Sequence, residues 1–538
     1  METTPIETAE LSGDVWLRRT LYVIGGCFLL RLLFAAVVPL DLVHDEAYYW
    51  EWARRLDVCY YSKPPMVAWL IAASTSIFGD TAVAVRLPAI VLGTGGTIFV
   101  FLLARDMFGS KAGFWATLLS LASPGSAALG LVMTIDAPLL FCWSVALYAF
   151  WQLLKRDRTR FRWLVGVTVA IGLGILSKQT MLAFLLLAGS FLLISREDRI
   201  ELRRPALWIC AILALCFLTP VLWWNVQNGW VTLAHTSGHF SAEQVTMLKR
   251  LTRFLEFIGS QFGVVSPVTC WLFLSAGFVG VYSFKRCDRC TKFLLTFSVL
   301  PLLGAFALAF KQRVEPNWAA PAYIAGVVLA VGAVFQSHAR VLEAKGSDRR
   351  LSIALGTGIV ATVLTYLLGF GLGLEGTKLD PAVRLRGWAE LGVKVGDAFA
   401  ELPEPNRSLL VVTNGRAYAS ELAFYMPQHP EAFVWNPSGV VSTQYDVWGG
   451  PRESESRTAM IVTGGPTVPP ELAACFGQVD PIREVTVAIS SSRHLTVHLW
   501  RGVALDQAMV DEQIGFGTHG RERFANVALR PDLHRLER

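Results

Sequence analysis

Apolar blocks of about twenty residues recur along this 538-residue chain as far as residue 374. Three clear examples are residues 206–224, 293–310 and 318–335. Each block is near the length that crosses the hydrocarbon layer of a membrane as an α-helix. With 53% hydrophobic and only 17% charged residues, the chain is too apolar for one soluble core. The sequence therefore predicts an α-helical polytopic membrane protein.

We expect about eleven transmembrane helices in this chain. They are residues 20–40, 83–104, 112–131, 137–154, 163–177, 179–195, 205–224, 264–284, 293–310, 317–336 and 351–374. The first follows Arg18 and Arg19 as a signal sequence would, but its length and its internal Arg31 favour a retained helix. We expect Arg31 to pair with a carboxylate in the helix bundle.

The loops between these spans fall into two classes. Alternate loops are strongly basic, namely residues 155–162, 196–204, 285–292 and 340–350. The positive-inside rule places these loops and the N-terminus in the cytoplasm. The net charge of +6 therefore belongs to the membrane topology, and no nucleic acid partner is implied. The opposite loops carry few charges, all at the outer ends of helices, which predicts a concentrated site on the outer face.

Beyond residue 374 the apolar blocks stop. Strand-like runs at 409–413, 460–463 and 495–500 lie between turns rich in Pro and Gly. We predict a transmembrane domain over 1–374 and a small C-terminal α/β domain over 375–538, whose last part, from Gly515, is charged and loosely ordered. An odd number of spans puts this domain outside, which is the periplasm in a Gram-negative cell.

His44, Asp45 and Glu46 follow the first span and precede an aromatic run at 48–52 that is typical of an interfacial helix. A carboxylate at this level could accept a proton from an acceptor hydroxyl, which makes Asp45 the candidate base. Glu46 is a second catalytic candidate, and Glu51 is expected to be solvated. The alternative role for Asp45 or Glu46 is to cap a helix that begins near Ala47.

Lys63 stands in Ser62-Lys63-Pro64-Pro65, where the prolines force an extended entry and then start a helix. A lysine held there could bind a lipid phosphate as it leaves, because such a departure needs positive charge where negative charge develops. The alternative is a lysine that snorkels to the membrane interface.

Four more residues occupy the outer ends of spans. Asp136 could be a second catalytic acid, or the N-cap of a helix with Pro138 in its first turn. Lys178 lies between two apolar runs and needs a partner, for which phosphate is suitable. Arg86 and Arg313, with Lys311 beside it, are further candidates for the donor phosphate.

No metal site is evident in the sequence. Cys287 and Cys290 have CxxC spacing without a second pair. His235 and His239 would share a helix face, but no third and fourth ligand accompanies them. Most other cysteines lie inside apolar blocks as small buried groups, without a disulfide framework.

In this order, the residues resemble the bacterial relatives of protein O-mannosyltransferases and of the transferases that add aminoarabinose or galacturonic acid to lipid A, within the C superfamily of glycosyltransferases. The resemblance covers about the first 340 residues. Its motifs are His44-Asp45-Glu46-Ala47-Tyr48-Tyr49-Trp50, Ser62-Lys63-Pro64-Pro65, Val85-Arg86-Leu87-Pro88, Asp136, Ser177-Lys178 and Glu315-Pro316-Asn317-Trp318. Ser62 stands where the aminoarabinose transferases commonly have an acidic residue, which argues against a metal site of their kind.

The resemblance implies a membrane enzyme that takes a sugar from a polyprenyl-phosphate carrier and inverts the anomeric centre. Asp45 takes the catalytic acidic position, Asp136 the second one, and Lys63 and Lys178 hold the donor phosphate. No cofactor is assigned, and a divalent cation stays open. The acceptor is lipid A or its core oligosaccharide, with secreted protein as the alternative, and the enzyme lies in the bacterial inner membrane.

Two other functions share these spans. A transporter of lipid-linked sugar would need polar groups through the bilayer, yet the spans are almost free of charge apart from Arg31, and no internal repeat is apparent. A scaffold that displays the C-terminal domain would not need Asp45, Lys63 and Lys178 on one face.

Overall fold

The computed structural model describes residues 5–155, 160–238, 245–339, 345–370, 380, 382–438, 440–451, 458–490 and 493–512. The chain divides into two compact units. The helical unit consists of Met1–Val37, Arg86–Thr219 and Phe240–Tyr366, and the mixed unit of Val38–Val85, Pro220–His239 and Leu367–Arg538. Two segments from the N-terminal half thus fold with the C-terminal part. The domain boundary at 374 stays a prediction.

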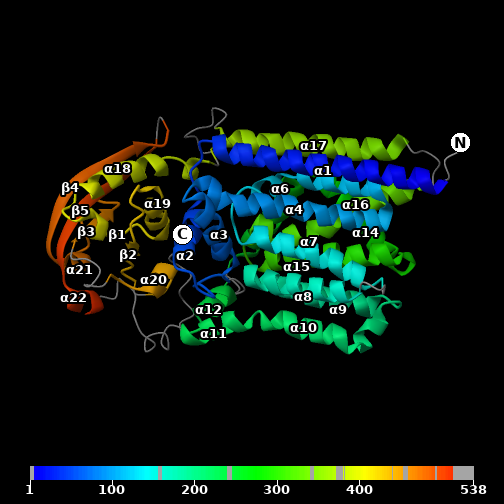
Figure 1. Ribbon diagram of the computed structural model, residues 1–538, viewed down its shortest axis with the longest axis horizontal. Coiled ribbons are helices and arrows are strands. Elements are labelled where there is room, and N and C mark those ends of the chain that lie inside the picture. The colour runs from blue at the N-terminus through cyan, green and yellow to red at the C-terminus, as the bar shows by residue number, and fades with distance from the viewer. Residues whose placement is uncertain are drawn as a thin grey trace. The chain divides into compact units, whose positions relative to one another are not determined.

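The helical unit is an assembly of long apolar helices (Figure 1). Its α-helices are α1 (Pro5–Val37), α4 (Ala82–Phe108, from Arg86), α5 (Ser110–Leu121), α6 (Pro124–Leu129), α7 (Asp136–Leu153), α8 (Arg160–Ser177), α9 (Leu182–Ile194), α10 (Pro205–Cys216), α13 (Met247–Val265), α14 (Pro267–Tyr282), α15 (Arg289–Lys311), α16 (Ala320–Ala339) and α17 (Lys345–Gly369). Short 3-10 turns are η1 (Gln179–Met181), η2 (Arg199–Arg203), η3 (Phe284–Arg286) and η4 (Pro316–Ala319). The first and last of the long helices, α1 and α17, lie side by side, with the rings of Phe34 and Tyr366 4.6 Å apart.

Seven helices in the described residues are long and apolar enough to cross a membrane, or eight if one bent pair is a single span. The sequence predicted eleven. The block at 112–131 forms two short helices because Ser123 and Pro124 end α5 and start α6. The block at 179–195 forms the 3-10 turn η1 and the 13-residue helix α9.

Helices α13 and α14 form the bent pair, with an angle of 111° at the break. Ser266 stands at the break with a left-handed φ of 81°, and Pro267 opens α14. A residue before proline is disfavoured in the α conformation, so the sequence Ser266-Pro267 ends one helix and starts the next. The predicted spans 205–224 and 264–284 leave residues 225–263 as a long outer loop. In the described part these residues contain the end of α11, α12 and most of α13 instead, because α13 has apolar residues at helical spacing.

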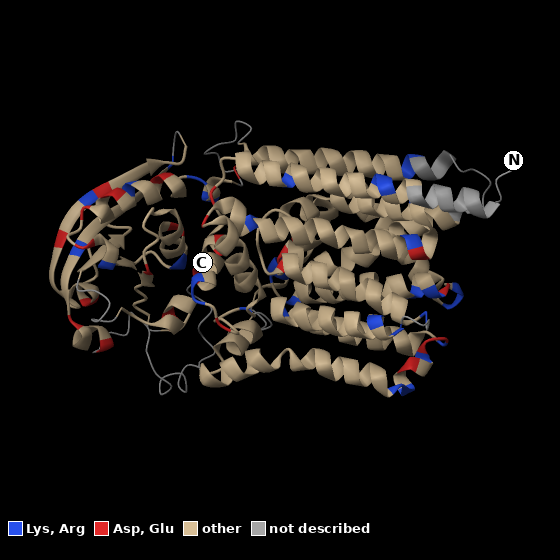
Figure 2. Ribbon diagram, in the orientation of Figure 1, with Lys and Arg blue, Asp and Glu red and all other residues tan. Residues whose placement is uncertain are grey.

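Charges gather at one end of the helical unit, and the interior of the long helices is nearly free of them (Figure 2). At this end Lys155, just after α7, pairs with Asp106 near the end of α4. Arg160 at the start of α8 pairs with Glu201, and the Arg289 Nη2 at the start of α15 lies 2.7 Å from Asp198 Oδ1. The described parts of the predicted cytoplasmic loops 155–162, 196–204 and 285–292 therefore share one end.

The mixed unit contains a five-stranded sheet in the order β2-β1-β3-β5-β4. The strands are β1 (Leu409–Val412), β2 (Ala432–Val434), β3 (Thr458–Thr463), β4 (Phe476–Ala488) and β5 (His494–Leu505). Strands β2, β1 and β3 are parallel, while β5 runs antiparallel to both β3 and β4. The three runs read as strands in the sequence are β1, part of β3 and part of β5.

The mixed unit also contains helices. They are α2 (His44–Arg54), α3 (Met66–Phe78), α11 (Thr219–Gln227, from Pro220), α12 (Val231–Gly238), α18 (Trp388–Ala400), α19 (Arg416–Tyr425), α20 (Gln444–Trp448), α21 (Pro470–Ala473) and α22 (Gln507–Glu512), with the 3-10 turns η5 (Val383–Leu385) and η6 (Pro405–Arg407). All residues of β1 are buried, since α19 contacts β1, and Leu472 of α21 and Val510 of α22 pack with Leu409 and Val411.

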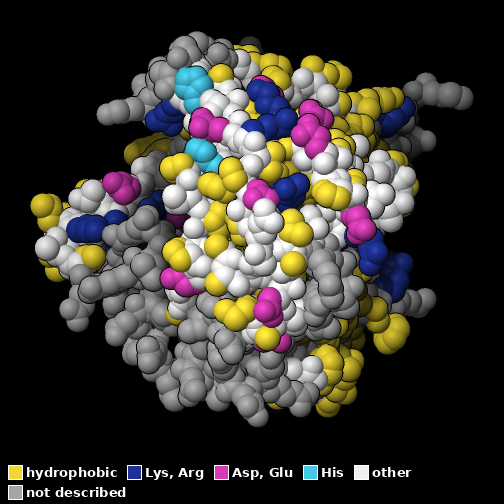
Figure 3. Space-filling view, turned by 90° about the vertical axis from the view of Figure 1, so that its left-hand side faces the viewer, with side chains coloured by type: hydrophobic (Ala, Val, Ile, Leu, Met, Phe, Trp, Pro, Cys, Tyr) yellow, Lys and Arg dark blue, Asp and Glu magenta, His cyan; other side chains and the backbone are white. Residues whose placement is uncertain are grey.

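The outer part of the sheet is polar. Strands β4 and β5 carry cross-strand pairs, such as Arg501 Nη2 with Asp480 Oδ2 at 2.9 Å and His498 Nδ1 with Glu484 Oε2 at 3.8 Å. Figure 3, which faces this part of the molecule, shows acidic and basic side chains interspersed among hydrophobic ones. Charged side chains on an edge strand such as β4 oppose pairing with another chain.

We predict that Gly93→Ala destabilises the helical unit by about 1–3 kcal/mol, the usual cost of overpacking. A Cβ at Gly93 of α4 would lie 2.7 Å from the Gly130 Cα at the end of α6, which is a steric clash. The measurement is the melting temperature of the purified protein in detergent. Gly96→Ala on the same helix is the control, because its nearest neighbour is an ordinary 3.7 Å away. Equal melting temperatures for the two variants would contradict the close approach of these backbones.

Candidate functional site

The carboxylate of Asp136 joins three segments of the helical unit. Lys178 Nζ, between α8 and η1, donates to Asp136 Oδ1 at 2.8 Å, and Asn317 Nδ2, in η4, donates to Asp136 Oδ2 at 2.7 Å. The Asp136 and Lys178 side chains are only 5% and 15% exposed. Asp136 is the first residue of α7 and its N-cap is Ile135, so the side chain connects segments instead of capping its own helix.

This cluster lies at the end of the helical unit opposite the basic loops. Asp136 and Lys155 stand at the two ends of α7, and its 18 residues rise by roughly 27 Å. The ion pair of Lys155 with Asp106 puts the C-terminal end of α4 beside the basic loops. Arg86, near the other end of α4, therefore lies at the same end of the helical unit as Asp136. Arg160 and Arg289 stand at the starts of α8 and α15 and form their ion pairs at the end with the basic loops. The C-terminal ends of α8 and α15 therefore lie at the same end of the helical unit as Asp136.

Arg86 and Arg313 differ in accessibility. Arg86 is 3% exposed, and Arg313 has a 75% exposed side chain whose Nε lies 3.4 Å from Glu315 Oε1. The helical unit therefore brings Asp136 and Lys178 into direct contact and holds the two arginines at the same end. Of these two, Arg313 is the more accessible to a soluble anion.

Arg31 was expected to pair with a carboxylate. Its partners are neutral instead: Nη1 donates to Thr94 Oγ1 at 3.2 Å, and Nη2 donates to the Ser126 backbone oxygen at 2.9 Å and to Ser126 Oγ at 3.2 Å. The guanidinium is fully buried, and a Cβ at Gly130 would lie 2.3 Å from its Nη1. Several neutral oxygens can satisfy a guanidinium because it has five N–H donors.

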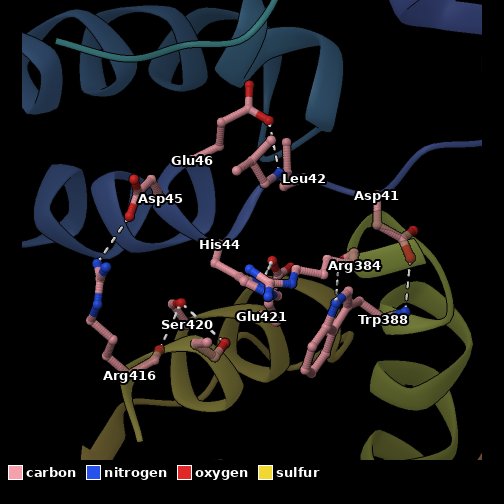
Figure 4. A network of polar contacts seen from close by, with 12 residues as sticks. Asp41, Leu42, His44, Asp45, Glu46, Arg384, Trp388, Arg416, Ser420 and Glu421 are labelled. Carbon is pink, nitrogen blue, oxygen red and sulfur yellow. Dashed lines mark hydrogen bonds and ion pairs between the residues drawn. The ribbon is translucent and has the colours of Figure 1, made fainter. Parts of the chain in front are cut away.

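Asp45 lies in the mixed unit, in the first turn of α2, where Arg416 Nη1 of α19 lies 3.0 Å from its Oδ1 (Figure 4). Arg416 also lies over the Tyr48 ring, 4.8 Å from its centroid. The Asp45 side chain is 45% exposed. Because α2 begins at His44 with Val43 as its N-cap, Asp45 is not the helix cap. Its carboxylate is thus oriented by a cation and accessible to a substrate.

His44 points away from Asp45 in Figure 4, toward Glu421 of α19. His44 Nδ1 lies 3.0 Å from Glu421 Oε1, and the Glu421 side chain is fully buried. Burial lowers the pKa of His44 and outweighs the Asp45 carboxylate, which raises it. A neutral imidazole then donates its Nδ1 hydrogen to Glu421, which fixes the ring and leaves Nε2 as an acceptor.

Glu46 and Glu51 are both fully buried in α2. The Val43 backbone N–H donates to Glu46 Oε2 at 2.9 Å, so Glu46 closes the first turn of the helix. This contact gives Glu46 a structural role, and its catalytic role stays a prediction. Glu51 was expected to be solvated; instead it pairs with Arg54 at 2.6 Å, and burial raises its pKa.

The aromatic residues of α2 pack inside the mixed unit, although the sequence suggested a helix at the level of the lipid headgroups. Trp50 and Trp52 are no more than 1% exposed. The Trp52 ring stacks on Tyr60 at 4.4 Å, and Trp50 contacts Phe424 of α19 edge-on at 5.0 Å. The C-terminal segment supplies the Phe424 contact, which could not be identified from the local pattern.

Lys63 lies in the turn before α3. Its backbone oxygen accepts a hydrogen bond from the Tyr60 N–H at 3.0 Å, and Pro65 is the N-cap of α3, as the two prolines predicted. The side chain is partly buried. The mixed unit thus contains Asp45, Glu46 and Lys63, whereas the helical unit contains Asp136, Lys178, Arg86 and Arg313.

The described residues contain no group of three or more His, Cys, Asp or Glu side chains that could hold a metal ion. His235 packs against the Tyr61 ring at 5.0 Å, and His239 lies outside the described residues. Cys287 and Cys290 are free thiols.

The residues that sequence reasoning missed are the partners of the predicted ones. Arg416 and Glu421 are 371 and 377 positions from Asp45 and His44, and no local signal connects them. Asn317 is part of the motif Glu315-Pro316-Asn317-Trp318, but the sequence assigned it no role. Its position at the start of a predicted span, beside Pro316, was the one available signal.

Comparison with known proteins places these residues in a family context. A family model described as dolichyl-phosphate-mannose-protein mannosyltransferase matches residues 62–224. A lipid A galacturonosyltransferase of Rhizobium johnstonii is 32% identical over 320 residues, which are 58% of this chain and 65% of that protein. An undecaprenyl phosphate-alpha-4-amino-4-deoxy-L-arabinose arabinosyl transferase of Pseudomonas aeruginosa is 30% identical over 174 residues, 31% of each chain. The chain thus spans just under two thirds of the first relative and about a third of the second.

The fold is similar to that of ArnT from Cupriavidus metallidurans in its crystal structure bound to undecaprenyl phosphate. The TM-score is 0.60 at 17% identity, over 90% of this chain and 98% of that chain. The chain is therefore a multi-pass membrane protein with an ArnT-like fold. The resemblance to protein O-mannosyltransferases and lipid A sugar transferases, inferred from the sequence motifs, is confirmed.

We predict that Asp136→Ala destabilises the helical unit by about 3 kcal/mol, because it leaves the Lys178 ammonium nearly buried without its carboxylate. Adding Lys178→Met should restore part of the loss. Unfolding of the two single variants and the double variant in detergent gives the coupling energy. Additive losses would show that the ion pair contributes nothing to the stability of the fold.

Proposed function

We propose that the protein is a glycosyltransferase that moves a sugar from a polyprenyl-phosphate carrier to lipid A or its core oligosaccharide. The observation that carries this proposal is the 32% identity with a lipid A galacturonosyltransferase over 320 residues. The likeness of the fold to an undecaprenyl-phosphate-binding transferase supports the same choice of carrier.

In the proposed reaction an acceptor oxygen attacks the anomeric carbon while the bond from that carbon to the phosphate oxygen breaks. The carrier leaves as polyprenyl phosphate, and the acceptor proton passes to the Asp45 carboxylate. Attack opposite the leaving group inverts the anomeric centre. If the acceptor is a phosphate, it arrives ionised and Asp45 only orients it.

Arg416 supports the role of Asp45. Its guanidinium holds one carboxylate oxygen at 3.0 Å, which fixes the direction of the other. With its side chain 45% exposed, Asp45 is accessible to an acceptor. A general base must lie within hydrogen-bond reach of the proton that it takes.

We assign the donor phosphate to Lys63 and Lys178, with Arg86 and Arg313 as additional cations. Lys178 uses one of its three N–H donors on Asp136, so two remain for phosphate oxygens. Asp136 then acts as a positioning carboxylate for Lys178. Positive charge fixed before the reaction stabilises the leaving phosphate without reorganisation.

The topology is part of the proposal. Eleven spans over 1–374 would place the domain 375–538 and the catalytic residues in the periplasm, with the charged end in Figure 2 in the cytoplasm. The basic loops that share that end of the helical unit support this orientation. The protein would lie in the inner membrane, where polyprenyl-phosphate sugars are available.

The second candidate function is O-glycosylation of secreted proteins. The match of residues 62–224 to the protein mannosyltransferase model favours it. The two functions differ only in the acceptor. Mass spectrometry of lipid A and of periplasmic glycoproteins, from cells with and without the gene, separates them.

Asp45→Asn should reduce the transfer rate by about 10²–10⁴-fold, because the amide cannot accept the proton. The measurement is mass spectrometry of lipid A from deletion cells complemented with the variant. Glu390→Gln is the matched control, since Glu390 is another exposed carboxylate of the mixed unit, paired with Lys394 at 2.8 Å. Full sugar addition by the Asn variant would exclude Asp45 as an essential base.

Lys63→Met should lower kcat by about 10²–10³-fold, the usual loss when one stabilising donor is removed from a developing negative charge. The assay uses purified protein with a polyprenyl-phosphate sugar in excess. Lys394→Met, on the surface of α18, is the control. An unchanged kcat for Lys63→Met would remove Lys63 from the group that binds the phosphate.

A further inference from the structure

A basic cavity of about 550 Å³ lies within the mixed unit. Its lining includes Arg384, Arg386, Arg493, His44 and His494, and none of its lining residues is acidic. These residues come from the start of α2, from η5 and the segment after it, and from the start of β5 with the residue before it. The cavity is separate from the carboxylate of Asp45, although His44 immediately precedes Asp45 in the chain.

The three arginines of this cavity differ in their partners. Arg386 is anchored by the buried Asp380, with Nη1 3.3 Å from Oδ2. Neither Arg384 nor Arg493 forms an ion pair with a carboxylate of the described residues. Two guanidinium groups without an acidic partner in the described part of the chain therefore face the same cavity. Such groups bind oxyanions well, because their planar forks match carboxylate and phosphate oxygens.

One wall of the cavity is aromatic and firmly held. The ring of Trp388 meets His44 edge-on at 5.3 Å and Tyr418 edge-on at 4.9 Å. The Trp388 backbone N–H donates to Asp41 Oδ2 at 2.8 Å, and its Nε1 donates to the Arg384 oxygen at 3.1 Å. Figure 4 shows His44, Arg384 and Trp388 gathered on the side of α2 away from Asp45. The indole thus fixes the backbone that carries Arg384.

We infer that this cavity binds a saccharide that carries an oxyanion, with Arg384 and Arg493 on the phosphate or carboxylate and Trp388 and Tyr418 along the sugar. Pockets for such ligands combine an aromatic wall with a few well-placed polar groups. The inference rests on the proposed function, in which the bound sugar is the charged end of the acceptor. Binding in this cavity places that acceptor beside the helix turn that carries Asp45.

The test is ligand binding by the full-length protein in detergent, without any donor. Glucosamine 1-phosphate and galacturonic acid are the two anionic probes, with glucosamine and inorganic phosphate as the partial probes. At least one anionic sugar should bind more tightly than both partial probes. Arg384→Gln and Arg493→Gln should each weaken that binding about tenfold or more, the loss expected for a charge-assisted hydrogen bond.

Arg483→Gln is the matched control, because Arg483 is an exposed arginine of the same unit that pairs with Glu401 at 3.4 Å outside the cavity. It should bind the probes as the wild type does. The inference is overturned if Arg384→Gln and Arg493→Gln bind as the control does. It is also overturned if inorganic phosphate or glucosamine alone binds as tightly as the anionic sugars. The stronger of the two anionic probes tells whether the oxyanion is a phosphate or a carboxylate.

Transfer assays keep this inference separate from the proposed function. If the wild type binds the anionic sugar but transfers nothing from any polyprenyl-phosphate donor, the proposed function fails and the cavity assignment stands. If transfer proceeds and Arg384→Gln leaves the KM of the acceptor unchanged, the cavity assignment alone fails. A raised acceptor KM with an unchanged donor KM supports both.

Discussion

An ionisable group at the edge of a hydrocarbon layer is costly unless a partner is fixed beside it, and this constraint explains how the end of the helical unit opposite the basic loops is organised. Asp136 has such partners in Lys178 and Asn317, at 2.8 Å and 2.7 Å. These three residues come from the starts of α7 and η1 and from η4, so one carboxylate connects segments far apart in the sequence. The lysine is held in place and keeps donors available for an anion.

In the mixed unit the same principle works through the C-terminal segment. Helix α2 carries Asp45, but the groups that orient Asp45 and His44 are Arg416 and Glu421 of α19. The aromatic side chains of α2 are buried against this segment, so packing as well as charge holds the C-terminal segment to α2. The C-terminal part of the chain therefore shapes the region around the candidate base and supplies most of the basic cavity.

The sequence alone predicts the features that depend on local pattern. The apolar blocks predicted the long helices, and the alternation of basic loops predicted the charged end. Pro64 and Pro65 predicted the start of α3. One apolar block is interrupted at Pro124, and the described residues contain seven or eight helices of spanning length where the sequence predicted eleven. The pattern also did not predict that Glu51 is buried or that Arg31 bonds to neutral oxygens, because the burial and the hydrogen bonds depend on contacts distant in sequence.

The central claim is the transfer of a sugar from a polyprenyl phosphate to a lipid A-type acceptor. The most direct measurement incubates the purified full-length protein with polyprenyl-phosphate galacturonic acid or aminoarabinose and lipid A, and follows both products by mass spectrometry. The account predicts one sugar added to lipid A for each polyprenyl phosphate released. Release without a glycosylated lipid, or sugar found on protein alone, would contradict it.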